Sequence, residues 1–337
     1  MRAGVNSLQT ATDPYAPLRG LMRRHGASCS PKEFYWAVNS AYHAVEAAQY
    51  DELHADMYAE LPPVWRRLLG HLPASPTQLR FLDIGAGTGL VGEFLQEMCP
   101  DRIGALVLLE PCEAMIEIAR KKSEGWSFPA EFVRGDISAL EGDSLFDVVT
   151  ANSVLHHIVD LGEFCGKAES LVRPGGVLLT AQDSRADAPS DSVFLKRRGT
   201  VARRSGRGLC ARTQSLAARA VRRIRPGFRL GALAEAANAP LLNEGVIKSP
   251  MTLAAIWSVT DFHVPGQIGG MGRGISRLDL ERYMERMTLV DSATYHFHGS
   301  NWQSLTQAEK ERELGWWNAG DPHGEMFCTA WQRKEGL

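Results

Sequence analysis

The stretch that decides the fold of this chain is FLDIGAGTGL, residues 81–90. Its first four residues form an apolar run with one acid, Asp83, and lead directly into three alternating glycines, Gly85, Gly87 and Gly89. Because glycine has no Cβ, such a segment lets the backbone turn sharply and come close to a ligand. A dinucleotide-binding pattern needs its third glycine at position 90, which is leucine here. The stretch therefore predicts a strand and a tight turn at a nucleoside site of another kind.

Further strand-like runs follow, and each one ends at polar residues. They are residues 105–109 before Glu110, residues 131–136 ending in Asp136, residues 146–151 before Asn152 and Ser153, and residues 177–181 before Asp183. Strands that alternate with helices favour a doubly wound parallel sheet with right-handed crossovers. Ligands of such sheets bind at the carboxyl ends of the strands. We therefore expect these polar side chains to line one crevice, where Glu110 can accept hydrogen bonds from ribose hydroxyls.

In order and spacing, these motifs resemble those of the class I S-adenosylmethionine-dependent methyltransferases, whose first motif is an acid followed by Gly-x-Gly-x-Gly. The resemblance covers about residues 63–183 and resumes near the C-terminus. It implies an α/β fold with a doubly wound, mostly parallel, seven-stranded Rossmann-like sheet, and S-adenosyl-L-methionine as the cofactor. In that family an acid after the third strand accepts a hydrogen bond from the exocyclic amine of adenine, and Asp136 is the matching residue.

The resemblance also implies which residues hold the cofactor. Tyr50 matches a tyrosine that many small-molecule methyltransferases place before the first motif, over the bound cofactor. The expected cofactor residues are Tyr50, Asp83, Gly85, Ala86, Gly87, Thr88, Gly89, Glu110, Pro111, Asp136, Ile137, Asn152 and Ser153. A non-catalytic nucleoside-binding protein could retain the glycine segment, but intact motifs at four strands argue against it.

The rest of the chain is predicted to be arranged around this core. Helical spacing of apolar residues after Ser30, a capping residue, predicts helices over residues 30–72. The expected divisions are a helical N-terminal cap (1–62), the cofactor-binding core (63–183), an insertion after the fifth strand that forms a substrate or lid region (184–282), and a C-terminal part (283–337). In that last part, residues 289–297 and 326–331 predict two strands that complete the sheet.

Histidines are the candidate catalytic groups. Methyl transfer from a sulfonium requires in-line alignment of the nucleophile, and a hydroxyl or ammonium acceptor must also lose a proton. His156 and His157 follow the fourth strand, where methyltransferases present residues to the acceptor, and Asp183 could orient one of them. His263 lies in the insertion before a glycine-rich segment, residues 266–274, which is typical of a closing lid.

No metal site is predicted from the same histidines. Adjacent histidines are expected to point apart, and the sequence has no His-Glu-x-x-His helix or cysteine cluster. The six cysteines are scattered and are expected to be reduced thiols. In the tail, strand alternation would place His296 and His298 on one face.

The composition is that of an ordinary soluble enzyme, with 44% hydrophobic and 23% charged residues among 337. No apolar run approaches the ~18 residues that span a bilayer. Residues 1–20 have no apolar signal core, so a cytoplasmic location is expected.

The charge of the chain is strongly uneven. Residues 196–229 contain 12 of the 37 lysines and arginines and no acid, so the rest of the chain has 25 basic residues against 39 acids. An amphipathic basic helix in this stretch could pair with the protein's own acids or contact an anionic membrane peripherally. Nucleic acid is disfavoured because few aromatics interleave the arginines. The sequence thus favours methyl transfer to a small molecule over an RNA or a lipid-soluble acceptor, and it leaves the methylated atom open.

Overall fold

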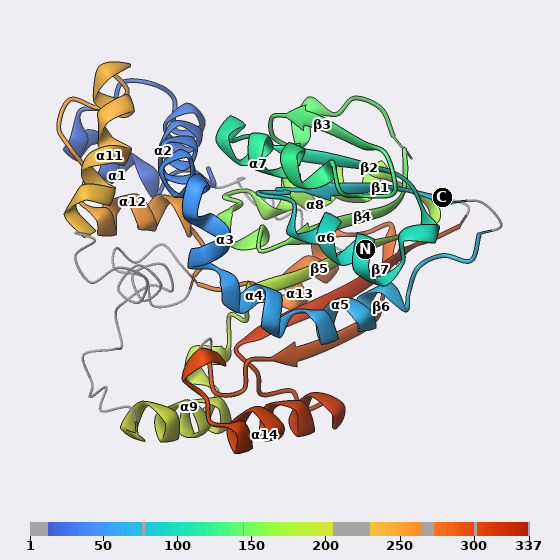
Figure 1. Cartoon of the computed structure of the whole chain (residues 1–337). Coiled ribbons are helices and arrows are strands. Elements are labelled where there is room, and N and C mark those ends of the chain that lie inside the picture. The colour runs from blue at the N-terminus through green and yellow to red at the C-terminus, as the bar shows by residue number, and fades with distance from the viewer. Residues whose placement is uncertain are drawn as a thin grey trace, which may run out of the picture.

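The structure is a computed structural model that describes residues 13–75, 78–143, 145–204, 230–264, 273–299 and 302–335. A seven-stranded sheet with helices on both faces forms the larger part of the molecule (Figure 1). A helical lobe lies beside the ends of its strands. Two further helices, α9 (Ser192–Arg204) and α14 (Gln307–Asn318), lie at the lower edge of the same view.

The sheet has the strand order β3-β2-β1-β4-β5-β7-β6. Its strands are β1 (Leu79–Ile84), β2 (Ile103–Glu110), β3 (Ala130–Arg134), β4 (Phe146–Asn152), β5 (Val172–Ser184), β6 (Met287–Tyr295) and β7 (Met326–Arg333). The first five strands are parallel, and β7 is antiparallel to both of its neighbours. The predicted doubly wound, mostly parallel sheet is therefore confirmed. Its order reverses between β1 and β4, and ligands of such sheets bind outside the strand ends at this point.

Each face of the sheet is covered by its own apolar layer. Neighbouring residues of a strand point to opposite faces, so Phe81 and Leu82 belong to different clusters. Helices that contribute to the first cluster include α5 (Pro62–Leu69), α6 (Leu90–Met98) and α7 (Glu113–Ser123). Those that contribute to the second are α8 (Leu161–Leu171) and α13 (Arg277–Tyr283). Burial on both faces explains why the strands are continuous apolar runs in the sequence.

The helical lobe combines the start of the chain with the insertion. It consists of α1 (Leu18–His25), α2 (Pro31–Glu46), α11 (Leu230–Asn243) and α12 (Leu253–Thr260), which share one apolar cluster. Trp257 Nε1 donates a hydrogen bond to the Tyr42 hydroxyl at 2.8 Å, and this hydroxyl donates to Glu46 Oε1 at 2.5 Å. The predicted cap of α2 is confirmed, since Ser30 forms a capping box with Glu33. Two short helices, α3 (Tyr50–Leu53) and α4 (Ala55–Glu60), continue from α2 to α5.

The two C-terminal strands are present, but β6 ends earlier than predicted. It ends at Tyr295, and His296 then adopts a left-handed backbone conformation with φ 59°. The expected strand alternation of His296 and His298 is therefore wrong. His296 forms an ion pair with Glu60, and His298 Nδ1 lies 2.9 Å from Glu313 Oε1.

A glycine beside β6 gives a prediction about stability. A Cβ on Gly324 would lie 2.3 Å from the backbone oxygen of Tyr295, which is too close for any relaxed structure. We expect Gly324→Ala to lower the free energy of unfolding by about 1–3 kcal/mol, the usual cost of overpacking. Chemical denaturation checks this value. Gly315→Ala is the matched control, because nothing lies within 4 Å of its Cβ position in a helix. Equal denaturation midpoints for the two variants would contradict the prediction.

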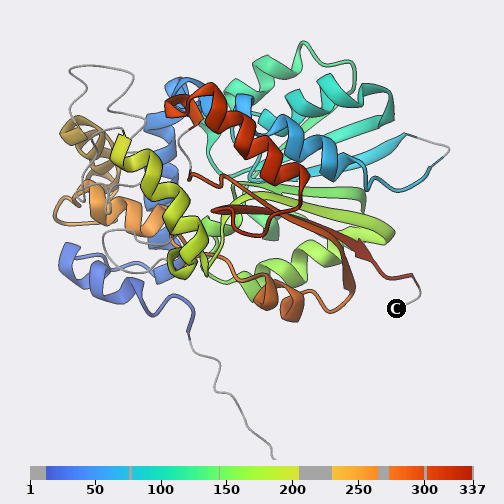
Figure 2. The same cartoon turned by 90° about the horizontal axis from the view of Figure 1, so that it is seen from below.

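The described part of the basic stretch forms ion pairs with acids of the same chain. Arg197 of α9 (Ser192–Arg204) makes two hydrogen bonds to Asp321, at 2.9 and 2.7 Å, just beyond α14 (Gln307–Asn318). Arg198 lies 3.7 Å from Glu325. Figure 2 shows α9 and α14 side by side. Residues 205–229, like most of the predicted glycine-rich lid, lie outside the described residues. Among the described helices, none has the length and apolar character needed to cross a bilayer.

Candidate functional site

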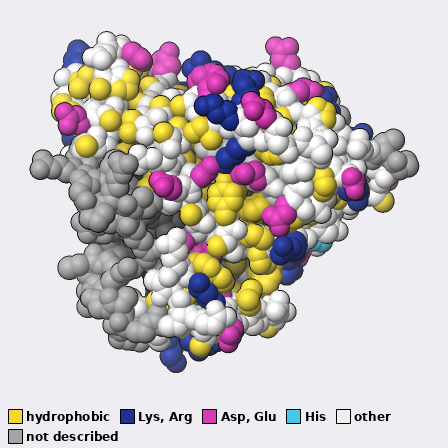
Figure 3. Space-filling view, in the orientation of Figure 1, with side chains coloured by type: hydrophobic (Ala, Val, Ile, Leu, Met, Phe, Trp, Pro, Cys, Tyr) yellow, Lys and Arg dark blue, Asp and Glu magenta, His cyan; other side chains and the backbone are white. Residues whose placement is uncertain are grey.

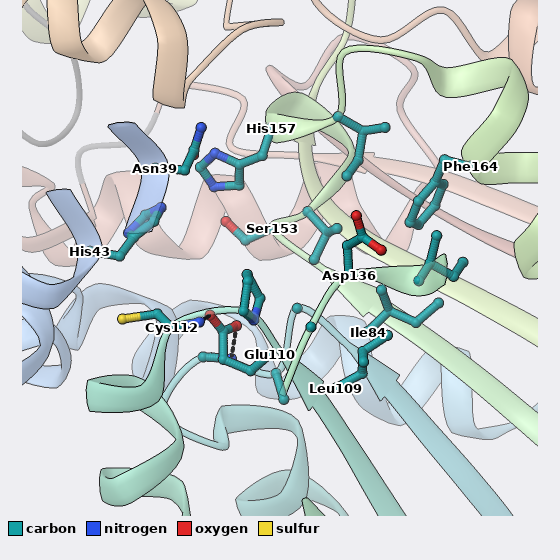
Figure 4. A pocket seen from close by; sticks show the side chains of 18 of the residues that line it. Asn39, His43, Ile84, Leu109, Glu110, Cys112, Asp136, Ser153, His157 and Phe164 are labelled. Atoms are coloured by element: carbon teal, nitrogen blue, oxygen red, sulfur yellow. Dashed lines mark hydrogen bonds between the residues drawn. The ribbon is translucent and has the colours of Figure 1, made fainter. Parts of the chain in front are cut away.

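A cavity lies at the carboxyl ends of β1, β2 and β4, between the sheet and α2. The sequence-predicted residues that line it are Tyr50, Asp83, Gly85, Ala86, Gly87, Glu110, Pro111, Asp136, Ile137, Asn152, Ser153 and His157. Thr88, Gly89, His156, Asp183 and His263 do not line it. Figure 4 shows Glu110 on one side of the cavity, Asp136 on another, and His157 near Asn39 and His43.

The glycine turn forms the part of the cavity wall that follows β1. Gly85 and Gly87 have φ values of 63° and 54°, which residues with a Cβ rarely adopt. The backbone N–H of Gly85 donates to the carbonyl of Leu109 at 2.8 Å, which holds the turn against β2. A Cβ on Gly85 would lie 2.7 Å from the side chain of Val154. The turn therefore has no room for a side chain at Gly85, while the predicted close approach to a ligand stays a prediction.

Glu110 connects the glycine turn to the end of β2. Its Oε2 accepts a hydrogen bond from the N–H of Gly87 at 3.0 Å, and its Oε1 accepts one from the N–H of Cys112 at 2.9 Å. Burial raises the pKa of Glu110 to about 7, although both backbone hydrogen bonds act in the opposite direction. Each carboxylate oxygen keeps a second lone pair that can accept a further hydrogen bond.

Three other residues of the first motif, Asp83, Thr88 and Gly89, make contacts that hold the glycine turn in place. Asp83 is buried, and its Oδ1 accepts a hydrogen bond from the Thr150 hydroxyl at 2.7 Å. Burial raises the pKa of Asp83 to about 7. The hydroxyl of Thr88 donates to Asp51 at 2.6 Å, and Gly89 starts α6 close to Ala119. These contacts explain why Thr88 and Gly89 turn away from the cavity.

The wall beyond β3 combines one acid with apolar side chains. Asp136 follows the strand and accepts a hydrogen bond from the N–H of Ser138 at 2.9 Å, which caps the short turn Ile137–Ala139. Ile84, Leu109 and Phe164 lie on the same side of the cavity (Figure 4). A flat apolar ring with a polar edge fits between such groups.

Two hydrogen bonds hold the part of the cavity wall that follows β4. Asn152 accepts a hydrogen bond from Trp65 Nε1 at 3.2 Å. Ser153 has a φ of 61° and donates its N–H to the carbonyl of Ala181 at 2.8 Å. Left-handed backbone at a residue with a Cβ is uncommon and often marks a functional site.

His157 lies in the cavity wall. Its Nδ1 lies 2.5 Å from the carbonyl oxygen of Thr260, so Nδ1 carries the proton and Nε2 keeps a free lone pair. The hydroxyl of Tyr35 donates to the backbone oxygen of His157. Burial holds the pKa of His157 well below 6.5, and the neighbouring His156 and His43 add to the effect.

His156 lies behind His157 as seen from the cavity, and its side chain contacts Asp183. Oδ1 of Asp183 accepts the backbone N–H of His156 at 2.9 Å and lies 2.8 Å from its Nδ1. Burial alone would lower the pKa of His156, but the hydrogen bond and charge of Asp183 outweigh it and raise the pKa above 6.5. The predicted partnership of Asp183 with a histidine is therefore present, at His156.

The expectation that the two adjacent histidines point apart is wrong. Their ring centroids lie 4.0 Å apart, because the residues stand in a short 3-10 turn, Leu155–His157, and not in a strand. The carboxylate of Asp261 joins them, and ligand atoms of the three residues lie within 4.8 Å of one another. His263 supports this turn by donating its backbone N–H to the carbonyl of His156 at 2.8 Å, and burial lowers the pKa of its ring to about 4.

Several cavity residues come from α2 and were not predicted as site residues. Tyr35, Asn39 and His43 line the cavity at four-residue spacing, which places them on one face of the helix. This stripe of polar and aromatic side chains at four-residue spacing was the signal available in the sequence. Asp261 was not predicted as a site residue, and nothing local to it in the sequence indicates that it lies beside His157.

Comparison with known proteins agrees with this geometry. Residues 82–180 match a family described as a methyltransferase domain. A ubiquinone biosynthesis O-methyltransferase of Methylocella silvestris is 38% identical over 109 residues, which is 32% of this chain and 41% of the relative. One of Sinorhizobium fredii is 35% identical over 121 residues, 34% of this chain and 47% of the relative. The chain thus spans less than half the length of the curated relatives it matches.

Among solved structures, the complex between the Haloferax volcanii Trm112 methyltransferase activator and its methyltransferase partner contains a similar fold. The similarity has a TM-score of 0.50 at 12% sequence identity, and it covers 87% of this chain and 98% of that chain. At this identity the likeness concerns the fold alone.

Proposed function

We propose that this chain, which belongs through its residues 82–180 to the class I S-adenosylmethionine-dependent methyltransferases, transfers the methyl group of that cofactor to a hydroxyl oxygen of a small molecule. The observation that carries the proposal is the cavity that joins two halves of different chemistry. One half contains the glycine turn with Glu110, and the other contains His157 with His156 behind it.

The first half suits S-adenosyl-L-methionine. Glu110 would accept hydrogen bonds from both ribose hydroxyls, since each of its oxygens has a lone pair left over from the Gly87 and Cys112 bonds. The adenine ring would lie among the apolar side chains near Asp136, and Tyr50 would cover the cofactor from α3. Asn152 and Ser153 would then border the methionine part, which leads the sulfonium methyl toward the histidines.

The second half suits deprotonation of a hydroxyl. The sulfonium is already an excellent leaving group, so alignment is the main requirement, and positioning alone can contribute roughly 7–11 kcal/mol in ideal cases. Oxygen attacks as it loses its proton, and His156 is the proposed proton acceptor because Asp183 stabilises its charged form. The acceptor oxygen would enter beside His157, which lines the cavity, and would reach the ring of His156 directly behind it. The O-methyltransferase names of the relatives agree with an oxygen acceptor.

The insertion and the N-terminal cap are proposed to form the acceptor side together. Tyr35 and His43 of α2 and Thr260 at the end of α12 contact His157 from the lobe. A wall of this kind would suit a small molecule.

Transfer can be tested without knowing the acceptor. The full-length protein is incubated with methyl-labelled S-adenosylmethionine and a bacterial extract that has been separated into small-molecule, RNA and lipid fractions. We expect label in a compound of the small-molecule fraction, and much less of this compound with Glu110→Ala when the cofactor concentration is low. Label in the RNA fraction would contradict the proposal and indicate an RNA methyltransferase. Cofactor binding without transfer to any fraction would also contradict it and indicate a non-catalytic nucleoside-binding protein.

The basic stretch gives a further prediction. In the described part, Arg197 and Arg198 already contact acids, and Figure 3 shows basic and acidic side chains intermixed over one face. We therefore propose that the described arginines of this stretch are taken up by the protein's own acids, so binding to tRNA or anionic vesicles should be negligible even at low ionic strength. Gel shift and vesicle sedimentation measure this. Tight binding that weakens steeply with salt would contradict it, because released counterions make polyanion binding salt-dependent.

A further inference from the structure

The short helices α3 and α4, residues 50–60, form a segment of the cavity wall with little apolar packing of its own. We call them the cover segment, and they contribute Tyr50 and Met57 to the cavity lining. No residue of α3 is buried, and Met57 is the one buried residue of α4. An element with so few buried apolar contacts opens easily, so its polar contacts decide how firmly it stays closed.

Lys122 of α7 is a common partner of both helices of the cover segment. Its Nζ lies 2.6 Å from Oδ2 of Asp51 in α3 and donates to the hydroxyl of Tyr58 in α4 at 2.8 Å. It also donates to Glu93 of α6 at 2.9 Å, and the Tyr58 hydroxyl donates to the same carboxylate oxygen at 2.8 Å. The three N–H donors of the ammonium group thus match three partners. The lysine side chain is only 18% exposed, so these contacts are sheltered from water.

Asp51 extends this network to the glycine turn. Its Oδ1 accepts a hydrogen bond from the Thr88 hydroxyl at 2.6 Å, while its Oδ2 contacts Lys122. Thr88 directly follows Gly87, whose N–H donates to Glu110. The network therefore ties α3 to the backbone that is proposed to hold the cofactor.

We propose that Lys122 is a positioning residue that keeps the cover segment closed over the cofactor and thereby sets the rate at which the cofactor enters and leaves. This inference rests on the proposed function only in placing S-adenosylmethionine in the cavity. The partners of Lys122 named above all belong to the protein, so the network stabilises the closed segment whether or not the cofactor is bound. Weakening it should therefore raise the association and dissociation rates together and change their ratio little.

Exchange of the cofactor measures this role without any acceptor. Full-length protein is loaded with labelled S-adenosylmethionine and chased with an excess of unlabelled cofactor, and calorimetry gives the dissociation constant. We expect Lys122→Met to release the label about 10-fold faster, on the scale of one hydrogen bond to a charged group, while the dissociation constant changes much less. Lys122→Arg keeps the positive charge and should restore slow release in part.

Lys121→Met is the matched control, because Lys121 is the exposed neighbour of Lys122 on the same helix. Its release rate should equal that of the wild type. Asp51→Asn should also speed release, and the combined effect with Lys122→Met should be smaller than the product of the two single effects, because both substitutions weaken one shared contact.

Two results would overturn the role of Lys122. One is equal release rates from Lys122→Met and Lys121→Met, and the other is a dissociation constant for Lys122→Met that rises as much as its release rate. If Lys122→Met does not fold, Asp51→Asn decides by the same two measurements. Either result would leave methyl transfer standing, whereas a chain that binds and releases the cofactor without transferring its methyl group would contradict only the proposed function.

Discussion

Replacement of His156 by alanine should lower the rate of methyl transfer by about 10²–10⁴, the usual contribution of a general base. The affinity for S-adenosylmethionine should change little, because His156 does not line the cavity that is proposed to hold the cofactor. Turnover with a labelled cofactor and the identified acceptor, together with calorimetry of cofactor binding, measures both quantities.

His263→Ala is the control for this experiment. Its backbone N–H, which the substitution keeps, contacts the carbonyl of His156, and its ring does not line the cavity. We expect a much smaller loss of turnover in this variant. Wild-type turnover in His156→Ala would remove His156 from the mechanism and leave His157 as the histidine that contacts the acceptor.

Replacement of Glu110 by alanine should weaken S-adenosylmethionine binding by about 10- to 100-fold. Hydrogen bonds to a charged group contribute about 1.5–3 kcal/mol each, and about 1.4 kcal/mol is a factor of ten in affinity. The substitution removes the proposed ribose contacts and also the acceptors that hold the N–H groups of Gly87 and Cys112. Calorimetric titration of the folded variant gives the dissociation constant.

Two further variants separate these effects. Glu110→Gln keeps the shape of the side chain and one carbonyl acceptor, so an intermediate loss is expected. Glu113→Ala removes an exposed acid of α7 that contacts Arg134 at 3.5 Å, and it should leave affinity unchanged. If Glu110→Ala binds the cofactor as tightly as Glu113→Ala, Glu110 does not hold the ribose.

The cofactor half of the site could be predicted because its determinants are local. A buried strand, a glycine turn and an acid at the next strand end follow one another in the sequence, and the parallel sheet brings strand ends together. Glu110 and Asp136 therefore lie in the cavity as expected. Thr88 and Gly89 differ, because the start of α6 turns them toward Asp51 and Ala119.

The acceptor half depends on contacts between distant segments. Thr260 and Asp261 reach His157 only because α12 packs on α2, through contacts such as that of Trp257 with Tyr42. No periodicity in the sequence encodes this contact. The facing rings of His156 and His157 depend on the single 3-10 turn after β4, which an extended reading of the segment could not reveal.

A crystal structure of the full chain with S-adenosylmethionine tests the central claim most directly. The account predicts that Glu110 accepts hydrogen bonds from the ribose hydroxyls, that adenine lies near Asp136, and that the sulfonium methyl faces the side of the cavity formed by His157. A cofactor bound with its ribose away from Glu110, or with its methyl group facing away from the histidines, would contradict the account.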